Sequence, residues 1–361
     1  MQIVIFAGGA GRRLWPISRE SSPKQFEPIV GDESTLQLAV DRVAPVYGFD
    51  SIFIATNERY LPIVRRQLPR VPADNVLVEP TRRDLGPAVG LAMAHLARRG
   101  EHEPVAILWS DNYIENVPAF VALLRAAEAL IADGTADILF IGETPRFANE
   151  NLGWIGLGEF AGRVGDLPYY GFESLTYRPP LERCREMFAA GSHVWNTGFF
   201  VTTPAYVRGL YERFSPEMWR QLGEIEATIG TPDYEATLQR VYPTMQAIHF
   251  DDAVLTHVDR ERALVLHSEM GWSDPGTLYA LKEALNPDPA ANVTKGLVID
   301  TASKDCLIYN YEPRKLVVAV GLEGMIVVNT DDAILVVHRD NIPLVKDMIN
   351  GLQGTELEAF S

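Results

Sequence analysis

The stretch VIFAGGAGRRLWPISRESSPKQF, residues 4–26, decides the fold of the N-terminal part of this chain. The apolar run from Ile3 to Phe6 predicts a buried parallel strand. The run ends just before Gly8, Gly9 and Gly11, where the missing Cβ atoms let backbone N–H groups close around an anion. The stretch therefore predicts a strand followed by a phosphate-binding loop.

The side chains that follow these glycines are cationic. Arg12, Arg13 and Lys24 bring three cationic side chains to the same loop. The dinucleotide-binding fingerprint would need a third glycine where this chain has Leu14, and the P-loop pattern with its lysine is absent. The loop therefore indicates a nucleoside triphosphate whose phosphate is attacked as well as held.

The composition of the 361 residues excludes several classes of partner. With a formal net charge of −16 at pH 7, the chain would be repelled by nucleic acid and by anionic membranes, so we expect neither as a partner. No apolar run is long enough to span a membrane and no leader pattern is present, so we expect a cytoplasmic protein. Cys184 and Cys306 are predicted to be unpaired thiols.

Strand-like and helical patterns alternate over the first part of the chain, to about residue 140. This alternation predicts an α/β fold with a Rossmann-like, mostly parallel sheet and helices on both faces. Ligands of such sheets bind at the carboxyl ends of the strands, where the loops after Phe6, Glu79 and Trp109 are expected to converge. We expect strands at Ile3–Phe6, Ser51–Thr56, Val76–Glu79, Val105–Trp109 and Ile138–Ile141, and helices near Thr35–Val46, Arg59–Leu68, Pro87–Arg98 and Ala119–Ala132.

The last part of the chain has a different pattern. A segment rich in proline and polar residues, 286–292, predicts a boundary between an N-terminal domain, residues 1–288, and a C-terminal domain, residues 289–361. Short strands separated by turns predict a small all-β unit beyond this boundary. The expected strands are Leu297–Asp300, Cys306–Tyr309, Leu316–Val320, Met325–Asn329 and Ala333–His338, and a helix at Pro343–Leu352 is expected to follow them.

The motifs GGAGRRLWP and SPKQF resemble the signature loop of the sugar-phosphate nucleotidyltransferases, in particular the mannose-1-phosphate guanylyltransferase (GDP-mannose pyrophosphorylase) branch. The resemblance implies a GT-A-like catalytic domain, a C-terminal left-handed β-helix often used for subunit contact, and hence a homodimer. It implies transfer of a guanylyl group from GTP to mannose 1-phosphate, giving GDP-mannose and pyrophosphate. Two alternatives stay open: another sugar 1-phosphate or nucleotide, or a catalytically silent regulator that binds nucleotide sugars.

The implied reaction needs in-line positioning and neutralised charge more than it needs a base, because the attacking phosphate oxygen is already an anion. By the resemblance, Arg13 contacts the β- and γ-phosphates and Lys24 the α-phosphate, and we expect both to face solvent until substrate binds. Asp111 lies at the carboxyl end of a predicted strand, and with Asp274 it is expected to hold Mg²⁺. Arg13, Lys24 and Asp111 are thus the expected catalytic residues.

A carboxylate after the third strand is expected to recognise the base. Glu79 and Asp84 occupy the place of the family's base-recognition loop, and a carboxylate there could accept hydrogen bonds from the N1–H and N2–H₂ edge of guanine. The family usually has Asn-Thr-Ala-Pro where this chain has the segment Asp84–Pro87. The identity of the base is therefore less firmly implied than the triphosphate.

Three residues are expected to bind the sugar phosphate. Asn196 matches the family's Trp-Asn-Ser-Gly segment, Gly153 its glycine-aromatic segment, and Arg178 the lysine of its Phe-x-Glu-Lys-Pro segment. Two departures concern the sugar: Tyr177 and Thr256 stand where the family usually has glutamate. Because both positions lose a carboxylate acceptor for sugar hydroxyls, we expect weakened discrimination between mannose and glucose.

Overall fold

The computed structural model describes residues 1–9 and 14–360, and these form two compact units. The first unit comprises residues 1–8, 39–110 and 114–272, and the second comprises residues 9–38, 111–113 and 273–361. Neither unit is contiguous in sequence. The predicted domain boundary between residues 288 and 289 describes a different division of the chain, and it stays a prediction.

The first unit is built on a nine-stranded sheet with the strand order β3-β2-β1-β4-β8-β5-β9-β7-β6. The strands β3, β2, β1 and β4 are parallel, as predicted, and so are β5 and β9. The sheet as a whole is mixed, because β8 is antiparallel to β4 and β5 and the long hairpin β6–β7 extends it. The strands are β1 (Gln2–Phe6), β2 (Ile52–Asn57), β3 (Val76–Glu79), β4 (Val105–Trp109), β5 (Ile138–Glu143), β6 (Gly153–Val164), β7 (Leu167–Tyr177), β8 (His193–Thr202) and β9 (Ala263–Ser268).

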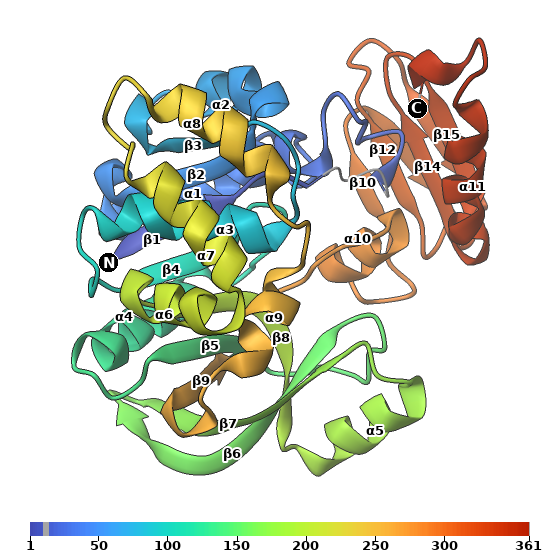
Figure 1. The fold of residues 1–361 in the computed structure, drawn as a ribbon. Coiled ribbons are helices and arrows are strands. Elements are labelled where there is room, and N and C mark those ends of the chain that lie inside the picture. Colours follow the sequence, from blue (N-terminus) through green and yellow to red (C-terminus); the bar gives the residue numbers. More distant parts are fainter. Residues whose placement is uncertain (10–13, 361) are drawn as a thin grey trace. The chain divides into compact units, whose positions relative to one another are not determined.

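The helices of this unit cover the sheet (Figure 1). Helix α3 is apolar on nearly all sides because it lies between the sheet and the helices α6 and α7. Its Gly90 lies so close to α7 that an added Cβ would be 2.4 Å from the Leu222 side chain. The helices are α1 (Thr35–Tyr47, whose first turn belongs to the second unit), α2 (Leu61–Gln67), α3 (Leu85–Ala97), α4 (Val117–Ala132), α5 (Leu181–Ala190), α6 (Pro204–Phe214), α7 (Pro216–Glu226), α8 (Tyr234–Val241) and α9 (Phe250–Ala253).

The parallel register brings the carboxyl ends of the first four strands to one edge of the sheet. Phe6 pairs with Trp109, and Asn57 pairs with Glu79. Ser110, directly after β4, donates a hydrogen bond from both its backbone N and its Oγ to the carbonyl oxygen of Phe6. The carboxyl ends of β1, β3 and β4, from which the loops after Phe6, Glu79 and Trp109 start, therefore lie along one edge of the sheet.

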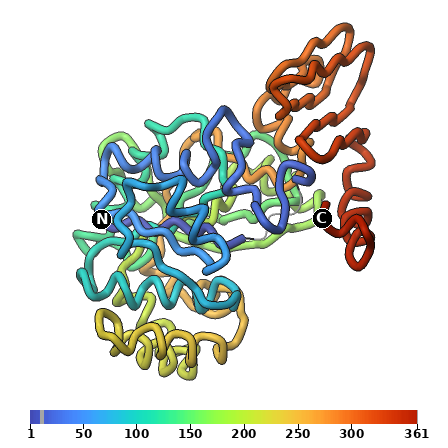
Figure 2. The backbone as a smooth tube through the Cα atoms, turned by 90° about the horizontal axis from the view of Figure 1, so that it is seen from above, coloured from blue at the N-terminus to red at the C-terminus, as the bar shows by residue number. Residues whose placement is uncertain are grey.

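The second unit contains stacked turns of a β-helix, seen as successive orange-to-red coils of the backbone in Figure 2. The strands β10, β12 and β14 pair in parallel, as do β11 and β13, and β15 closes the stack by pairing antiparallel with β14. The predicted all-β unit is thus confirmed, with one additional strand at its start. The elements are β10 (Val293–Lys295), β11 (Val298–Thr301), β12 (Leu307–Asn310), β13 (Val317–Val320), β14 (Met325–Asn329), β15 (Ile334–His338), α10 (Leu278–Leu285) and α11 (Ile342–Leu352).

Residues that follow the glycine loop belong to this same unit. Leu14, Trp15 and Ile17 are buried in one core with residues of α10 and the β-helix. The indole N–H of Trp15 donates a 2.7 Å hydrogen bond to the carbonyl of Phe360, and Lys295 donates a 2.6 Å bond to the carbonyl of Gly31. Residues 14–17 and the last described residues of the chain are therefore parts of one packed structure.

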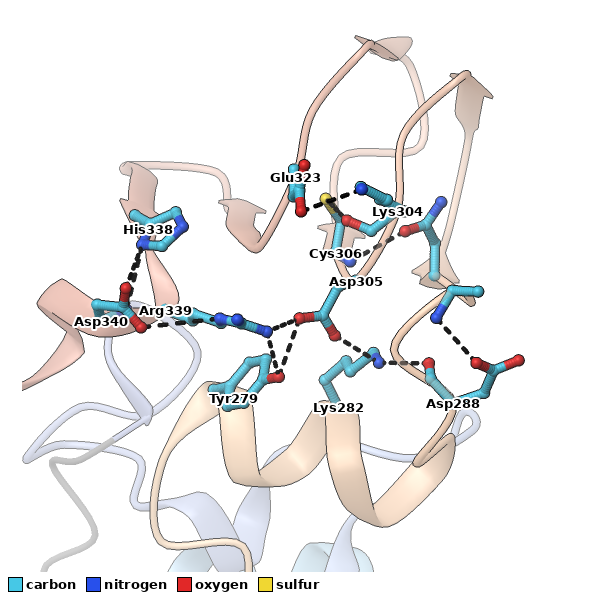
Figure 3. Close-up of polar contacts among 12 residues, drawn as sticks. Tyr279, Lys282, Asp288, Lys304, Asp305, Cys306, Glu323, His338, Arg339 and Asp340 are labelled. Carbon is cyan, nitrogen blue, oxygen red and sulfur yellow. Dashed lines mark hydrogen bonds and ion pairs between the residues drawn. The ribbon is translucent and has the colours of Figure 1, made fainter.

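A buried ionic network joins α10 to the β-helix (Figure 3). The carboxylate of Asp305 lies 2.7 Å from the ammonium of Lys282 and accepts a 3.0 Å hydrogen bond from the hydroxyl of Tyr279. It also pairs with Arg339, just after β15. Lys282 and Asp305 are almost completely buried, so removing either charge would leave the other without its buried partner.

Two further observations concern the whole described chain. Cys184 and Cys306 are both free, as predicted. Within residues 1–9 and 14–360, no helix is both long and apolar enough to cross a membrane.

Candidate active site

Lys24 is the centre of a three-residue ionic cluster in the second unit. Pro23 precedes a single 3₁₀ turn, Lys24–Phe26, which directs the lysine inward. The Lys24 Nζ lies 2.9 Å from Asp111 Oδ2 and 3.0 Å from Asp274 Oδ1. Three of the residues predicted to act together from positions far apart in the sequence are therefore brought to one place.

The charge of Lys24 is maintained by these neighbours. Burial lowers the pKa of its ammonium, but the charges of Asp111 and Asp274 and their hydrogen bonds outweigh burial and raise the pKa. The expectation that Lys24 faces solvent before substrate binds is wrong, since only 5% of the residue is exposed. The reason is that two carboxylates replace the water that an ammonium would otherwise need.

The two carboxylates are held by a short backbone bridge. Tyr113 and Ser273 pair antiparallel, with hydrogen bonds of 2.9 and 3.0 Å between their backbone N and O atoms. Asp111 lies two residues before Tyr113, and Asp274 directly follows Ser273. The bridge therefore fixes the two chain segments that carry the carboxylates, independently of the lysine between them.

This arrangement fits a magnesium ion. The side chains of Asp111 and Asp274 are 37% and 36% exposed, so each keeps oxygen surface that a cation can reach. Mg²⁺ typically takes one or two carboxylates and fills its remaining positions with phosphate oxygens and water. No cluster of three or more His, Cys, Asp or Glu side chains suited to a metal occurs in the described part of the chain. A site of two carboxylates would leave the remaining positions of the metal to water and to the phosphates of a substrate.

The glycine loop is described only in part. Gly9 accepts a 2.8 Å hydrogen bond at its carbonyl oxygen from the side-chain amide of Gln25, within the second unit. Gly8 ends the first segment of the first unit, and a Cβ added there would lie 3.8 Å from Glu79 Oε1. The predicted phosphate-binding residues Gly11 and Arg13 lie outside the described residues.

Glu79 is a buried carboxyl group at the end of β3. Its Oε2 accepts a 2.6 Å hydrogen bond from the hydroxyl of Tyr242, and the side chain is almost inaccessible to solvent. Burial raises the pKa of Glu79 to about 7, although the Tyr242 hydrogen bond opposes this shift. Its Oε1 accepts no hydrogen bond from a described residue and lies beside Gly8.

Asp84 has a structural role, as a helix cap, that its sequence context did not predict. It is the N-cap of α3, with a positive φ of 65°, and its carboxylate accepts a 2.9 Å hydrogen bond from the backbone N of Leu85. It also lies 3.2 Å from the Nδ1 of His249. Helix α3 therefore starts two residues before the predicted Pro87, and the carboxylate of Asp84 is partly occupied by its own helix.

The residues predicted to bind the sugar meet at one corner of the sheet. Gly153 pairs with Asn196 on β8 and with Tyr177 on β7, and Arg178 follows Tyr177 directly. A Cβ on Gly153 would lie 3.2 Å from the Asn196 side chain, so glycine keeps this place open. The Asn196 Oδ1 accepts a 2.9 Å hydrogen bond from the backbone N of Gly198, whereas its Nδ2 donates to no described residue.

The fourth residue of this corner is cationic. Arg178 has a positive φ of 46°, and its guanidinium lies 5.1 Å from the centre of the exposed Tyr177 ring. Its Nε donates a 3.2 Å hydrogen bond to the carbonyl oxygen of Asn151. Thr256 lies in a separate 3₁₀ turn, where its hydroxyl contacts the carbonyl of Asp252 at 3.4 Å. The prediction about Tyr177 and Thr256 thus concerns two different places in the first unit.

Comparison with known proteins identifies the family to which this chain belongs. A family model described as "Nucleotidyl transferase" matches residues 2–290, which is most of the chain. The chain belongs to the nucleotidyl transferase family. A second model, described as "MannoseP isomerase/GMP-like beta-helix domain", matches residues 296–352 of this nucleotidyl transferase.

Individual relatives resemble the nucleotidyl transferase over nearly its full length. A protein of Salmonella typhimurium named mannose-1-phosphate guanylyltransferase RfbM is 30% identical, over 99% of this chain and 73% of its own length. A putative mannose-1-phosphate guanylyltransferase of Vibrio cholerae is 32% identical, over 97% of this chain and 74% of its own. A crystal structure from Thermus thermophilus, titled mannose-1-phosphate geranyltransferase, has a TM-score of 0.84 and 27% identity, and covers 98% of this chain and 99% of that one.

Two residues of this nucleotidyl transferase were not predicted from its sequence. Glu143, the last residue of β5, is completely buried, and Tyr242 donates the hydrogen bond to Glu79. Glu143 follows an apolar run at the carboxyl end of a strand, the same signal that pointed to Asp111. Tyr242 carries no such signal, because it reaches Glu79 from a turn that is 163 residues away in sequence.

Proposed function

We propose that this nucleotidyl transferase transfers a guanylyl group from GTP to mannose 1-phosphate, with GDP-mannose and pyrophosphate as products. The observation that supports it most is the cluster of Lys24, Asp111 and Asp274, which joins an ammonium to two carboxylates able to hold a metal. Proteins named mannose-1-phosphate guanylyltransferase are similar to this chain over nearly all of its length. The family and the cluster thus agree on transfer of a nucleotidyl group.

The charges of the cluster suit attack on an α-phosphate. The reaction brings two anionic phosphates together, and its transition state carries negative charge on the transferred group and on the departing pyrophosphate. Lys24 would donate to the α-phosphate, and Asp111 and Asp274 would hold Mg²⁺. A bound Mg²⁺ would supply Lewis-acid neutralisation of phosphate oxygens. Arg13 and the loop glycines Gly9 and Gly11 would contact the remaining phosphates.

Base recognition is proposed for Glu79. Its oxygen beside Gly8 could accept from the N1–H or N2–H₂ group of guanine, groups that adenine does not present in this pattern. Because the pKa of Glu79 is raised to about 7, a donor from the base would also favour the ionised carboxylate. Asp84 would contribute less, since its carboxylate already caps α3.

Sugar binding is proposed for the corner formed by Gly153, Asn196 and Arg178. The Nδ2 of Asn196, which donates to none of the described residues, would donate to a sugar hydroxyl beside the open backbone of Gly153. Arg178 would pair with the phosphate of the sugar, for which a guanidinium offers two parallel donors. We also keep as proposals a cytoplasmic enzyme, a homodimer, and a catalytic domain that ends near residue 288 and precedes the β-helix.

The proposal is tested by measuring pyrophosphate release with four nucleoside triphosphates and a panel of sugar 1-phosphates, each with Mg²⁺. We expect the highest kcat/KM for GTP with mannose 1-phosphate. A higher value for another pair would keep the reaction class and replace the substrates. No release with any pair, together with tight binding of GDP-mannose, would instead favour a silent regulator of another protein.

A further inference from the structure

Tyr242 is a completely buried tyrosine whose hydroxyl contacts a buried carboxyl group. The hydroxyl donates a 2.6 Å hydrogen bond to Glu79 Oε2, and Glu79 itself is 9% exposed. Both residues belong to the first unit, as does Gly8, whose backbone lies near the other carboxylate oxygen, Oε1. The two oxygens of Glu79 therefore have different surroundings, because Tyr242 holds one of them and the other lies beside the start of the glycine loop.

The turn that carries Tyr242 is attached to the segment that follows β3. The guanidinium of Arg83 donates a hydrogen bond to the carbonyl oxygen of Pro243. The backbone N of Gly86 donates a 2.9 Å hydrogen bond to the carbonyl oxygen of Ile248, and a Cβ on Gly86 would lie 2.8 Å from that residue. These contacts lie within one unit, so they fix the position of the Tyr242 hydroxyl relative to the end of β3.

The bond from Tyr242 favours the ionised form of Glu79. Burial raises the pKa of Glu79 to about 7, whereas the hydrogen bond from Tyr242 lowers it. Burial and the neighbouring carboxylate raise the pKa of the Tyr242 hydroxyl, which therefore stays a donor at neutral pH. The other charged or titratable groups that act on this pair in the described part of the chain are Arg82, Arg83, Asp84 and Tyr211.

The ionisation of Glu79 decides which base its free oxygen can bind. An ionised carboxylate only accepts hydrogen bonds, and guanine presents donors at N1–H and N2–H₂ where adenine presents the acceptor N1. A protonated carboxyl group also donates, and would therefore suit adenine. Because Oε2 already accepts from Tyr242, a proton on Glu79 would be carried by Oε1.

We propose that Tyr242, through its hydrogen bond to Glu79 Oε2, is a positioning residue that keeps Oε1 of Glu79 an acceptor for guanine. The inference rests on the proposed role of Glu79 in base recognition. Tyr242 touches no substrate in this role, and it acts from a turn 163 residues away in sequence. The preference for guanine over adenine would thus depend on a hydroxyl that lies behind the base-recognition carboxylate.

A tyrosine that only fills the core would have a different signature. The ring of Tyr242 packs in the main apolar core of the first unit, and Tyr242→Phe keeps that ring. Loss of a purely structural hydroxyl would lower stability, and it would change the affinities for guanine and adenine nucleotides by the same factor. Only a hydroxyl that acts on Glu79 would change the ratio of these affinities and its dependence on pH.

The test measures dissociation constants for GTP and ATP with Mg²⁺ by calorimetry between pH 6 and pH 8.5, without sugar phosphate. The two triphosphate groups ionise alike, so the ratio of the dissociation constants reports on the base. In the unaltered protein, the preference for GTP should rise with pH around 7 as Glu79 ionises. In Tyr242→Phe, the preference at pH 7 should be roughly tenfold smaller, and its rise should move up by about one pH unit, because the lost donor no longer favours the carboxylate.

Two further variants make the result specific. Tyr234→Phe removes another tyrosine hydroxyl of the same unit, one that lies 2.8 Å from His95 Nε2, and it should leave the ratio and its pH dependence unchanged. Arg83→Met removes the bond to the Pro243 carbonyl and so loosens the turn that carries Tyr242. It should reduce the preference for GTP in the same direction, and it gives a second measurement if Tyr242→Phe fails to fold.

Several outcomes would overturn the inference. An unchanged ratio and pH profile in Tyr242→Phe, or in Arg83→Met if the first variant does not fold, would reduce Tyr242 to a core residue. Equal affinity of the unaltered protein for GTP and ATP, or a pH profile that persists in Glu79→Gln, would show that Glu79 does not recognise the base. A reduced preference in the variants, without any guanylyl transfer to mannose 1-phosphate by the unaltered protein, would keep the inference and reject the proposed function.

Discussion

Replacing Lys24 by methionine separates two effects of the ionic cluster. The substitution keeps the length of the buried aliphatic chain and removes the ammonium that lies 2.9 and 3.0 Å from two carboxylates. In turnover, the loss of one charged donor to the transferred phosphate is expected to cost about 2–4 kcal/mol of transition-state stabilisation. That corresponds to a fall in kcat of roughly 30- to 1,000-fold.

The same substitution should strengthen metal binding. Lys24 is a positive charge in direct contact with the carboxylates of Asp111 and Asp274, and it therefore competes with a divalent cation for them. A unit charge about 4 Å away is worth about 1–4 kcal/mol in surroundings between water and a protein surface. At the lower end of this range, Lys24→Met should bind Mn²⁺ roughly fivefold more tightly than the unaltered protein.

The assay combines Mn²⁺ titration with steady-state turnover at saturating GTP and Mg²⁺. Lys24→Arg serves as the control, because it keeps the charge but changes the geometry, and its Mn²⁺ affinity should rise much less than that of Lys24→Met. Circular dichroism and thermal unfolding confirm that each variant is folded. Near-normal turnover of Lys24→Met, or Mn²⁺ affinity that falls, would refute this account of the cluster.

Three other substitutions test separate parts of the site. Asp274→Asn should raise the Mg²⁺ concentration for half-maximal activity roughly tenfold, and EDTA should abolish activity of the unaltered enzyme; an unchanged Mg²⁺ dependence would reject the metal site. The pKa of Glu79 is raised to about 7, so the folded state holds its proton at pH values where the unfolded state has lost it, and the free energy of unfolding falls as pH rises from about 4.5 to 7. From pH 5 to pH 8, the free energy of unfolding of Glu79→Gln, measured with denaturant, should therefore rise by about 1–3 kcal/mol relative to that of the unaltered protein. The same pH dependence in both proteins would contradict a buried acid at this position. Tyr177→Glu should increase the preference in kcat/KM for mannose 1-phosphate over glucose 1-phosphate by roughly fivefold, and an unchanged ratio would show that this position does not contact the sugar.

Local patterns predicted much of the fold because they report on local burial. The alternation of apolar runs and amphipathic segments predicted β1 to β5 and the helices α1 to α4 to within a few residues. The short strands after residue 296 were also predicted, since turns separate them regularly. The antiparallel insertion of β8 between β4 and β5 was not predicted, because strand order depends on long-range pairing that no local pattern records.

The candidate site, like the fold, has features that the sequence predicted and features that it did not. Lys24, Asp111 and Asp274 were predicted individually and meet in the structure, as do Gly153 and Asn196. The burial of Lys24 was not predicted, because an ammonium is buried only when partners replace its water, and those partners are about 90 and 250 residues away in the chain. Arg13 and Gly11 stay predictions.

The position of the segment after the glycine loop also could not be predicted from the sequence. No sequence pattern indicated that Trp15 would donate a hydrogen bond to the carbonyl of Phe360, 345 residues later. Leu14, Trp15 and Ile17 share their core with α10 and β12. Such contacts follow from the complementary shapes of distant segments, and they become visible only when the whole unit is folded.

The most direct test of guanylyl transfer follows the fate of the phosphates. The enzyme is incubated with mannose 1-phosphate, Mg²⁺ and GTP labelled either at the α-phosphate or at the γ-phosphate, and the products are separated by chromatography. Attack on the α-phosphorus predicts that the α label enters GDP-mannose and that the γ label leaves only as pyrophosphate. Release of the γ label as inorganic phosphate, or the absence of labelled GDP-mannose, would contradict the proposed reaction.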